Sequence, residues 1–555
     1  MYPGAHAADN PDKPAVVLDG TDRVLTYGDL EDRSVRLANA LRGAGLVPGD
    51  TVGLLATNDP RIFEAYWACL RSGLYLTAVN THLSVSEAAY IVDDCDAKAL
   101  LVSADLGGLA AGVVAEVPVA FRLVWDGSID GFDDYDATLA AASPQVPADQ
   151  PRGADMLYSS GTTGRPKGVK PPLPARQVGD PGDTVVGVFG SLYAFGPDTV
   201  YYSPAPLYHA APLRFGMVTH ALGGTVVTAK RFDAEAALHA LDHHRVTHSQ
   251  WVPTHFVRML RLPEQVRRRY DVSRQRYVVH AAAPCPVEVK RAMIEWWGPV
   301  LQEYYSSTEA NGVCTINSAE WLAKPGSVGT AKLGVLRICD DAGAEVPVGV
   351  DGLVYFERDE VPFGYHKDPD KTRSVQHPDH PTWTTCGDIG HVDDDGFLFL
   401  TDRKAFMIIS GGVNIYPQEI EDSLILHPDV FDVAVIGVPD AEMGESVLAV
   451  VQPAAGVVPG DEVAERLLAH VRGRLAGYKV PRRVEFVEEL PRTATGKLVK
   501  GRLRNRFAPA TRSQVAHTEQ STHDQESGSS AFSAAPTAEC VRLVNEATMV
   551  SRWSP

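Results

Sequence analysis

Apolar and polar positions in the first hundred residues alternate between two periods. Short apolar runs at residues 15–18 and 51–55 have the composition of buried strands, whereas residues 30–41 place Leu30, Leu37 and Leu41 at helical spacing. Runs of the strand type return at residues 225–228, 246–253 and 277–283. Strands that alternate with helices are typical of an α/β fold whose sheet strands are joined by helical crossovers.

The pattern changes near residue 400. A strand-like run at 398–403 is followed by a glycine-containing turn and by a helix that begins at Pro417. Further strands are predicted at 432–438 and 447–452. We therefore predict a large N-terminal domain over 1–401, a small α+β C-terminal domain over 402–507, and a hinge at Asp402.

The composition changes again after Phe507. Residues 508–536 are rich in Ser, Thr, Gln, Ala and His and contain almost no large apolar side chains. Such a segment cannot bury enough apolar surface to offset its ordering entropy. We predict a disordered tail over 508–555, with one short helix at 540–550.

Composition and charge narrow the functional classes. The chain has 555 residues and a net charge of −19, with 45% hydrophobic residues, which fits several packed cores and argues against a general nucleic-acid binder. Its seven cysteines include no C-x-x-C pair. An odd and scattered set of cysteines fits a protein of a reducing compartment that has no structural disulfides. The longest apolar run, 185–195, is too short to span a bilayer. We expect a cytoplasmic protein; peripheral membrane contact and the oligomeric state are left open.

The segment 158–170, Y-S-S-G-T-T-G-R-P-K-G-V-K, carries the strongest chemical signal. Glycines, hydroxyls and basic side chains in one loop can offer N–H groups and positive charge to a polyphosphate. The loop is not a Walker A motif, because Pro166 and Gly168 stand where that motif needs Gly and Ser or Thr. The loop therefore predicts a nucleotide-phosphate site of another kind.

Five further segments follow in order. They read P-L-Y-H at 206–209, A-A-A-P at 281–284, Y-Y-S-S-T-E at 304–309, T-C-G-D-I-G at 385–390 and P-R-T-A-T-G-K at 491–497. Together with the loop at 158–170, this set resembles the adenylate-forming superfamily of acyl-CoA synthetases, peptide-synthetase adenylation domains and luciferases. Along the whole chain, the sequence is most similar to CoA ligases of the fatty-acid type. The resemblance covers nearly all of residues 10–507.

The resemblance implies a fold and a nucleotide site. The fold is α/β, with α/β layers and a distorted β-barrel in the large domain and a small mobile α+β domain. ATP phosphates would lie on the phosphate loop, made of Ser160, Gly161, Thr162, Thr163, Gly164 and Lys167. Tyr305 would stack on adenine, Thr308 would contact the α-phosphate, and Glu309 would hold Mg²⁺, a cation that prefers oxygen ligands.

The same resemblance assigns the ribose and catalytic contacts. Asp388 would accept hydrogen bonds from both ribose hydroxyls, with Arg403 as a second ribose contact. Lys497 would bridge the substrate carboxylate and the α-phosphate, neutralising charge as two anions approach. After rotation about the hinge, Gly411 and Gly412 would let the pantetheine arm of CoA pass close to the backbone.

Several residues keep two interpretations. His209 lies beside the acid carboxylate by resemblance but also fits a packing role, and Ala283, in the turn at 281–284, marks either the adenine and acyl pockets or ordinary small-residue packing. The basic residues 479, 482 and 483 fit either CoA phosphates or a solvated loop. We do not interpret the histidines at 239, 243, 244 and 248 as a metal site, since a predicted strand interrupts their helical spacing.

Two positions depart from the superfamily pattern. Ser306 replaces the usual glycine, and Ala405 stands where many relatives carry a lysine, with Lys404 one residue earlier. Whether Lys404 substitutes for that lysine is left open.

The predicted activity is that of an ATP-dependent acyl-CoA synthetase. A carboxylic acid, expected to be a medium- or long-chain fatty acid, would react with ATP and then with CoA through an acyl-adenylate. An aryl, terpenoid or steroid acid is an alternative substrate, and an acyl-AMP ligase that loads a carrier protein is an alternative enzyme. A luciferase-type oxygenase shares the first half-reaction, and a catalytically silent binding protein would be expected to lack the full set of site residues.

Overall fold

The computed structural model describes residues 2–159, 166–411, 413–440, 442–492 and 498–507. Residues 2–507 belong to one compact unit. Its N-terminal part contains a six-stranded sheet of order β7-β6-β5-β3-β4-β8, in which every adjacent pair is parallel. The strands are β3 (Thr51–Leu55), β4 (Tyr75–Ala78), β5 (Ala97–Ser103), β6 (Phe121–Trp125), β7 (Asp133–Asp134) and β8 (Ala154–Asp155).

Helices supply the crossovers of this sheet. They are α3 (Arg61–Leu70), α4 (Val85–Asp94), α5 (Gly107–Glu116) and α6 (Tyr135–Ala141), while α2 (Tyr27–Gly43) leads from the other sheet into β3 and α1 (Pro3–Asp9) packs against α2. The predicted helix at 30–41 lies inside α2, and the predicted strand at 51–55 is β3. The α/β alternation expected from the sequence is thus confirmed here.

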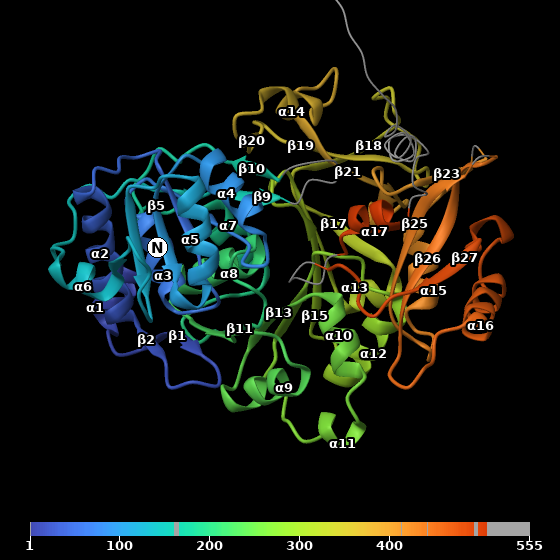
Figure 1. Ribbon diagram of the computed structural model, residues 1–555, viewed down its shortest axis with the longest axis horizontal. Coiled ribbons are helices and arrows are strands. Elements are labelled where there is room, and N and C mark those ends of the chain that lie inside the picture. The colour runs from blue at the N-terminus through green and yellow to red at the C-terminus, as the bar shows by residue number, and fades with distance from the viewer. Residues whose placement is uncertain (1, 160–165, 412, 441, 493–497, 508–555) are drawn as a thin grey trace, which may run out of the picture. The chain divides into compact units, whose positions relative to one another are not determined.

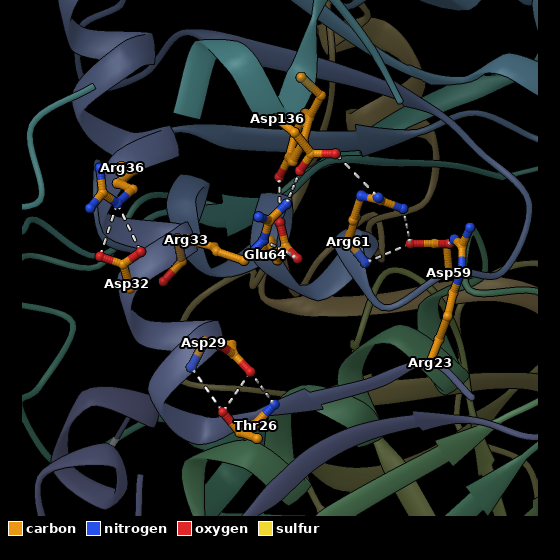
Figure 2. A network of polar contacts seen from close by, with 12 residues as sticks. Arg23, Thr26, Asp29, Asp32, Arg33, Arg36, Asp59, Arg61, Glu64 and Asp136 are labelled. Atoms are coloured by element: carbon orange, nitrogen blue, oxygen red, sulfur yellow. Dashed lines mark hydrogen bonds and ion pairs between the residues drawn. The ribbon is translucent and has the colours of Figure 1, made fainter. Parts of the chain in front are cut away.

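Ion pairs connect three of these helices (Figure 2). Arg33 on α2 donates from Nε to Glu64 Oε1 on α3 at 2.8 Å, and the Tyr135 hydroxyl on α6 donates to Glu64 Oε2 at 2.9 Å. Burial raises the pKa of the Glu64 carboxyl, and the Arg33 guanidinium opposes that shift. A buried carboxylate needs such partners, because an unpaired buried charge costs several kcal/mol, on the order of the whole stability of a domain.

A 13-stranded sheet forms the centre of the large domain (Figure 1). Its order is β18-β19-β21-β22-β17-β16-β15-β14-β13-β11-β12-β1-β2. Adjacent strands are parallel from β1 to β15 and antiparallel from β15 to β18. A parallel α/β layer thus continues into an antiparallel part, as the resemblance implied.

The strands of the parallel part are β1 (Pro14–Leu18), β2 (Val24–Thr26), β11 (Val200–Ser203), β12 (Thr225–Thr228), β13 (His248–Trp251), β14 (Tyr277–His280) and β15 (Leu301–Ser306), of which β2 is antiparallel to β1. Those of the antiparallel part are β16 (Val313–Asn317), β17 (Ser327–Leu333), β18 (Val335–Cys339), β19 (Gly352–Glu357), β21 (Trp383–Val392) and β22 (Leu398–Arg403).

The predicted strand at 277–283 ends three residues early. Ala282 has φ +76°, a left-handed conformation that an extended strand cannot contain. The chain therefore leaves the sheet after His280, and Ala281 and Ala282 form a turn at the carboxyl end of β14.

The remaining helices of the large domain lie between these strands. They are α7 (Thr184–Leu192), α8 (Ala210–Ala221), α9 (Ala234–His243), α10 (Pro253–Leu260), α11 (Glu264–Arg267), α12 (Val287–Trp297), α13 (Ser318–Ala323) and α14 (Pro369–Ser374). The apolar run at 185–195 is largely α7. A third sheet has three strands, β20 (Gly364–Tyr365), β10 (Lys167–Lys170) and β9 (Leu157–Ser159), and its strands β9 and β10 enter and leave the phosphate loop.

Residues 408–507 contain a separate sheet of order β24-β23-β26-β25, with β27 beside β26. Its strands are β23 (Ile408–Ser410), β24 (Val413–Ile415), β25 (Val430–Asp440), β26 (Gly444–Pro453) and β27 (Arg483–Phe486). Its helices are α15 (Pro417–Leu424), α16 (Asp461–Arg472) and α17 (Lys500–Phe507). All of them are coloured orange to red in Figure 1.

Strand periodicity explains how this small sheet is covered. Val433 and Val435 face one side and pack with α15 and α16, whereas Ala434 and Ile436 face the other side and pack with Leu503 of α17. The small α+β unit predicted from the sequence is confirmed as a fold. The boundary and hinge at Asp402 stay predictions, and the tail at 508–555 lies outside the described residues.

Candidate functional site

A cavity of about 1440 Å³ lies among the carboxyl ends of β13, β14 and β15. Such strand ends are the usual ligand-binding edge of a parallel α/β sheet. The cavity brings together five of the residues predicted from sequence: Lys167, His209, Thr308, Glu309 and Arg403. Residues far apart in the sequence, from 167 to 403, therefore line one cavity.

Asp388 and Arg403 are register partners on neighbouring strands β21 and β22. Arg403 donates from Nε to Asp388 Oδ1 at 2.8 Å, and the Tyr305 hydroxyl donates to Asp388 Oδ2 at 2.7 Å. Asp388 is 6% exposed, so both partners hold its carboxylate in one orientation. Asp388 thus contacts the other two residues that are predicted to bind the nucleoside, Tyr305 and Arg403.

Glu309 follows β15 and is 9% exposed at the cavity wall. The Tyr365 hydroxyl on β20 donates to Glu309 Oε1 at 2.9 Å, and among the described residues it is the one hydrogen-bond donor to this carboxylate. Within the described residues, the other carboxylate oxygen accepts no hydrogen bond. A single carboxylate beside a phosphate site fits Mg²⁺, which usually takes one or two protein oxygens and keeps waters and phosphate oxygens as its other ligands.

The loop that carries Thr308 and Glu309 is held by its neighbours. The Ser306 hydroxyl donates to the Gly312 carbonyl at 2.8 Å, and Arg214 on α8 donates from Nη1 to the Thr308 carbonyl at 3.3 Å. Arg214 is itself paired with Asp155 at 2.7 Å. Serine in place of the usual glycine at 306 is therefore accommodated by a side-chain hydrogen bond within the loop.

Lys167 begins the strand that leaves the phosphate loop. Its Nζ lies 2.6 Å from Asp368 Oδ2, and this contact raises the pKa of Lys167 by hydrogen bonding. The lysine is therefore cationic, as a phosphate contact requires. The five predicted loop residues Ser160, Gly161, Thr162, Thr163 and Gly164 lie outside the described residues, and so do Gly412 and Lys497.

His209 is the N-cap residue of α8, and its ring centroid lies 4.5 Å from that of Tyr208. Both residues line the cavity, and the contact of His209 with the acid stays a prediction. Ala281 and Ala282 also line it, whereas Ala283 does not. Gly411 has φ +57° in the turn after β23 and lies outside the lining.

Lys404 reaches the rim of the cavity but is engaged elsewhere. Its Nζ lies 2.6 Å from Asp341 Oδ1, and the two side chains are 50% and 84% exposed. An exposed pair of this kind contributes about 0–1 kcal/mol and breaks easily. Ala405 lines the same part of the cavity.

The sequence analysis missed the aromatic wall of the cavity. Phe189 of α7 has its ring centroid 4.9 Å from that of Phe215 on α8 and 5.3 Å from that of Tyr304 on β15. Gln250 of β13 lines the same region and accepts a hydrogen bond from the Tyr201 hydroxyl at 3.0 Å. The sequence held one signal for this wall. Tyr304 and Tyr305 are neighbours on a strand, and neighbouring strand residues face opposite sides, so the two tyrosine rings must lie in different surroundings.

The cavity therefore has two chemically different regions. One presents a carboxylate, an arginine and a lysine, which suit a ribose, a cation and phosphates. The other is mainly aromatic and suits an apolar molecule. The arrangement is that of a site that joins a nucleotide to an organic acid.

Comparisons with known proteins agree with this reading. The model of the AMP-binding enzyme family matches residues 4–366, and that of the AMP-binding enzyme C-terminal domain matches residues 419–497. The chain is 36% identical over 519 residues to a feruloyl-CoA synthase of an Amycolatopsis species, which covers 91% of this chain and 98% of the relative. It is 30% identical over 509 residues to the long-chain-fatty-acid–CoA ligase FadD13 of Mycobacterium tuberculosis, which covers 90% and 96%.

A solved structure shows the same fold. The amide bond synthetase McbA from Marinactinospora thermotolerans superposes with a TM-score of 0.76 at 30% identity and covers 91% of this chain and 99% of that one. In the part of the chain that the structure describes, no helix is long and apolar enough to cross a membrane. The chain belongs to the AMP-binding enzyme family, and hence to the adenylate-forming acid–thiol ligases that its motifs predicted.

Proposed function

We propose that the chain is a CoA ligase for an aromatic carboxylic acid. The acid and ATP would form an acyl-adenylate and diphosphate, and CoA would then displace AMP to give the acyl-CoA. The observation that carries the choice of an aromatic acid is the wall made by Phe189, Phe215 and Tyr304. The higher identity to a feruloyl-CoA synthase than to a long-chain-fatty-acid ligase, 36% against 30%, supports it.

The geometry of the wall suits a flat ring. The rings of Phe215 and Tyr304 are stacked at 5.8 Å with an interplanar angle of 22°, and Phe189 stands edge-on to Tyr304 at 64°. Aromatic pairs at such separations gain about 0.5–1.5 kcal/mol beyond the burial of their area. An alkyl chain would bury area on the same wall without that gain, so the wall favours an aryl acid over a fatty acid of similar size.

Adenylation needs two anions to approach each other. Lys167 would hold phosphate oxygens, and Lys497 would reach the substrate carboxylate and the α-phosphate. Bound Mg²⁺ would supply a second positive charge that stabilises the phosphate oxygens. Glu309 would hold this cation, while Asp388 and Arg403 would fix the ribose. Positioning and charge neutralisation of this kind supply most of the catalysis in phosphoryl chemistry, and the same logic applies to attack at the α-phosphorus.

Thioester formation needs an entry for CoA. Gly411 and Gly412 would line the path of the pantetheine arm after the small domain has rotated about Asp402. The thiol sulfur would attack the acyl carbon, and AMP would leave with the electron pair of the broken C–O bond. His209, at the acid side of the cavity, would lie beside the carboxylate.

A cytoplasmic location stays a prediction.

The test is product identification by mass spectrometry. Purified protein is incubated with ATP, Mg²⁺, CoA and a pooled set of aryl, fatty, terpenoid and steroid acids. An aryl-CoA as the main product would support the proposal. A fatty acyl-CoA as the main product would mean that the substrate is a fatty acid and not an aryl acid. AMP and diphosphate without any acyl-CoA would point to a carrier protein or an amine as the acceptor. The absence of any turnover would refute the ligase.

A further inference from the structure

The segment from Gly364 to Asp368 connects β10, the strand after the phosphate loop, to Glu309, the proposed metal carboxylate, and neither the motifs nor the family comparison assigns it a role. Its first two residues form β20, which pairs with β10 through Val169 and Lys170. The His366 N–H extends this pairing by donating to the Gly168 carbonyl at 2.8 Å. The segment is therefore attached to β10, the strand that follows the phosphate loop.

Tyr365 connects the segment to Glu309. Its hydroxyl donates to Glu309 Oε1 at 2.9 Å, and its backbone N–H donates to Thr372 Oγ1 of α14 at 2.9 Å. Its ring packs beside Phe363, at 5.4 Å between centroids and close to perpendicular. Packing and hydrogen bonds thus hold the hydroxyl in place, as a group that orients another must be held.

Asp368 connects the other end of the segment to Lys167. Asp368 Oδ2 lies 2.6 Å from Lys167 Nζ, and Asp368 Oδ1 accepts the Lys371 N–H at the start of α14 at 2.9 Å. Glu309 and Lys167 are the presumed ligands of the cation and of the phosphates. One five-residue segment therefore contacts both groups that a metal–nucleotide complex would bridge.

We propose that Tyr365 is a positioning residue for the magnesium–ATP complex: its hydroxyl holds one oxygen of Glu309, so that the other oxygen would be oriented to hold the cation. The proposal rests on the proposed function. Without the hydroxyl, the Glu309 carboxylate loses the hydrogen bond that holds its orientation. The cation would then meet a carboxylate that must first be reoriented, and Mg²⁺ would bind less tightly.

The experiment measures ATP binding rather than turnover. Isothermal titration with ATP, repeated at a series of free Mg²⁺ concentrations, gives the Mg²⁺ concentration at which the affinity for ATP is half-maximally increased. Tyr365→Phe should raise that concentration about tenfold, which is the lower end of what losing a hydrogen bond to a charged group produces. It should leave ATP binding without Mg²⁺ and the KM for the acid unchanged.

Tyr270→Phe is the matched control. The Tyr270 hydroxyl also donates to a glutamate, Glu235 Oε1, at 2.9 Å, but on the surface between α9 and α11. Both variants lose the same kind of hydrogen bond, so only the variant in the site should change the Mg²⁺ dependence. Melting temperatures without nucleotide show whether either variant is unfolded.

A double-mutant cycle with Glu309→Gln tests whether Tyr365 acts through Glu309. Tyr365→Phe should have no further effect on Mg²⁺-dependent ATP binding in the Glu309→Gln background, because the group that it orients is already changed. A wild-type Mg²⁺ dependence in Tyr365→Phe, or an equal effect in both backgrounds, would overturn the proposal while the ligase stands. A wild-type chain that binds no ATP at any Mg²⁺ concentration would overturn the proposed function as well.

Discussion

Arg403 and Asp388 face each other directly across the β21–β22 ladder and are joined by a 2.8 Å contact from Nε to Oδ1. Arg403 is the residue after the predicted hinge, and Asp388 belongs to the large domain. The pair therefore places two residues that are predicted to contact the nucleoside beside the point about which the small domain is expected to turn.

The first prediction concerns this pair. Asp388→Asn removes the charge that neutralises the Arg403 guanidinium and weakens the acceptor for the ribose hydroxyls. Hydrogen bonds to charged groups contribute about 1.5–3 kcal/mol each, so the Kd for ATP should rise at least about tenfold. Glu357→Gln is the control, because it weakens the surface pair of Glu357 with Arg337, at 2.8 Å, outside the cavity. Equal ATP affinity in the two variants would contradict the ribose role.

The second prediction separates the two half-reactions. Lys497→Ala should nearly abolish adenylate formation, because no other lysine of the small domain is expected to neutralise the two approaching anions. It should spare thioester formation from a preformed acyl-AMP, because the carboxylate and the α-phosphate are already joined there and no longer approach as two anions. The rates of diphosphate release and of acyl-CoA formation from synthetic acyl-AMP check this. An equal loss in both would refute a role confined to the first step.

The third prediction tests the aromatic wall. Phe189→Leu keeps an apolar side chain but removes the edge-on contact at 5.3 Å from the Tyr304 ring. Losing an aromatic contact with the ring of the acid, at about 0.5–1.5 kcal/mol, predicts an about twofold to twelvefold lower kcat/KM for an aryl acid. The kcat/KM for a straight-chain acid of similar length should change less. If both acids lost the same factor, the wall would not select for aromatic rings.

The fourth prediction is a pH dependence of stability. Burial lowers the pKa of His220 to about 4, and the ring is held neutral between the Ala15 carbonyl at 3.0 Å and the Trp67 indole N–H at 3.3 Å. In the unfolded chain a histidine binds its proton near pH 6.5, so the unfolded state binds more protons between about pH 6.5 and 4. The stability that the neutral ring contributes is present above pH 6.5 and is lost as the pH falls toward 4.

The loss from His220 is at most about 1.4 kcal/mol for each pH unit below 6.5. Denaturant midpoints measured at pH 7.5, 6.5 and 5.5 should fall in that order. His220→Gln should show a smaller drop between pH 6.5 and 5.5 than the exposed-site control His239→Gln. Identical pH profiles for the two variants would mean that His220 does not carry the effect.

Much of the fold follows from local pattern. The strands β12 and β22 coincide with their predicted ranges, and α2 encloses the predicted helix, because periodicity and backbone propensity act over a few neighbouring residues. The end of β14 was predicted wrongly, because a run of three alanines gives no indication that Ala282 adopts a left-handed conformation. The helix α7 was seen only as an apolar run, although its Phe189 became part of the cavity wall.

The chain's motifs identified the family and predicted the residues of the nucleotide site, since each motif is a short run of residues whose side-chain chemistry is known from the sequence. Folding decided which distant side chains complete the site. Tyr365 reaches Glu309 across 56 residues, and Phe189, Phe215 and Tyr304 come from three separate elements. Such contacts depend on how whole elements pack against one another, and packing is a property of the entire core that no single stretch of residues encodes.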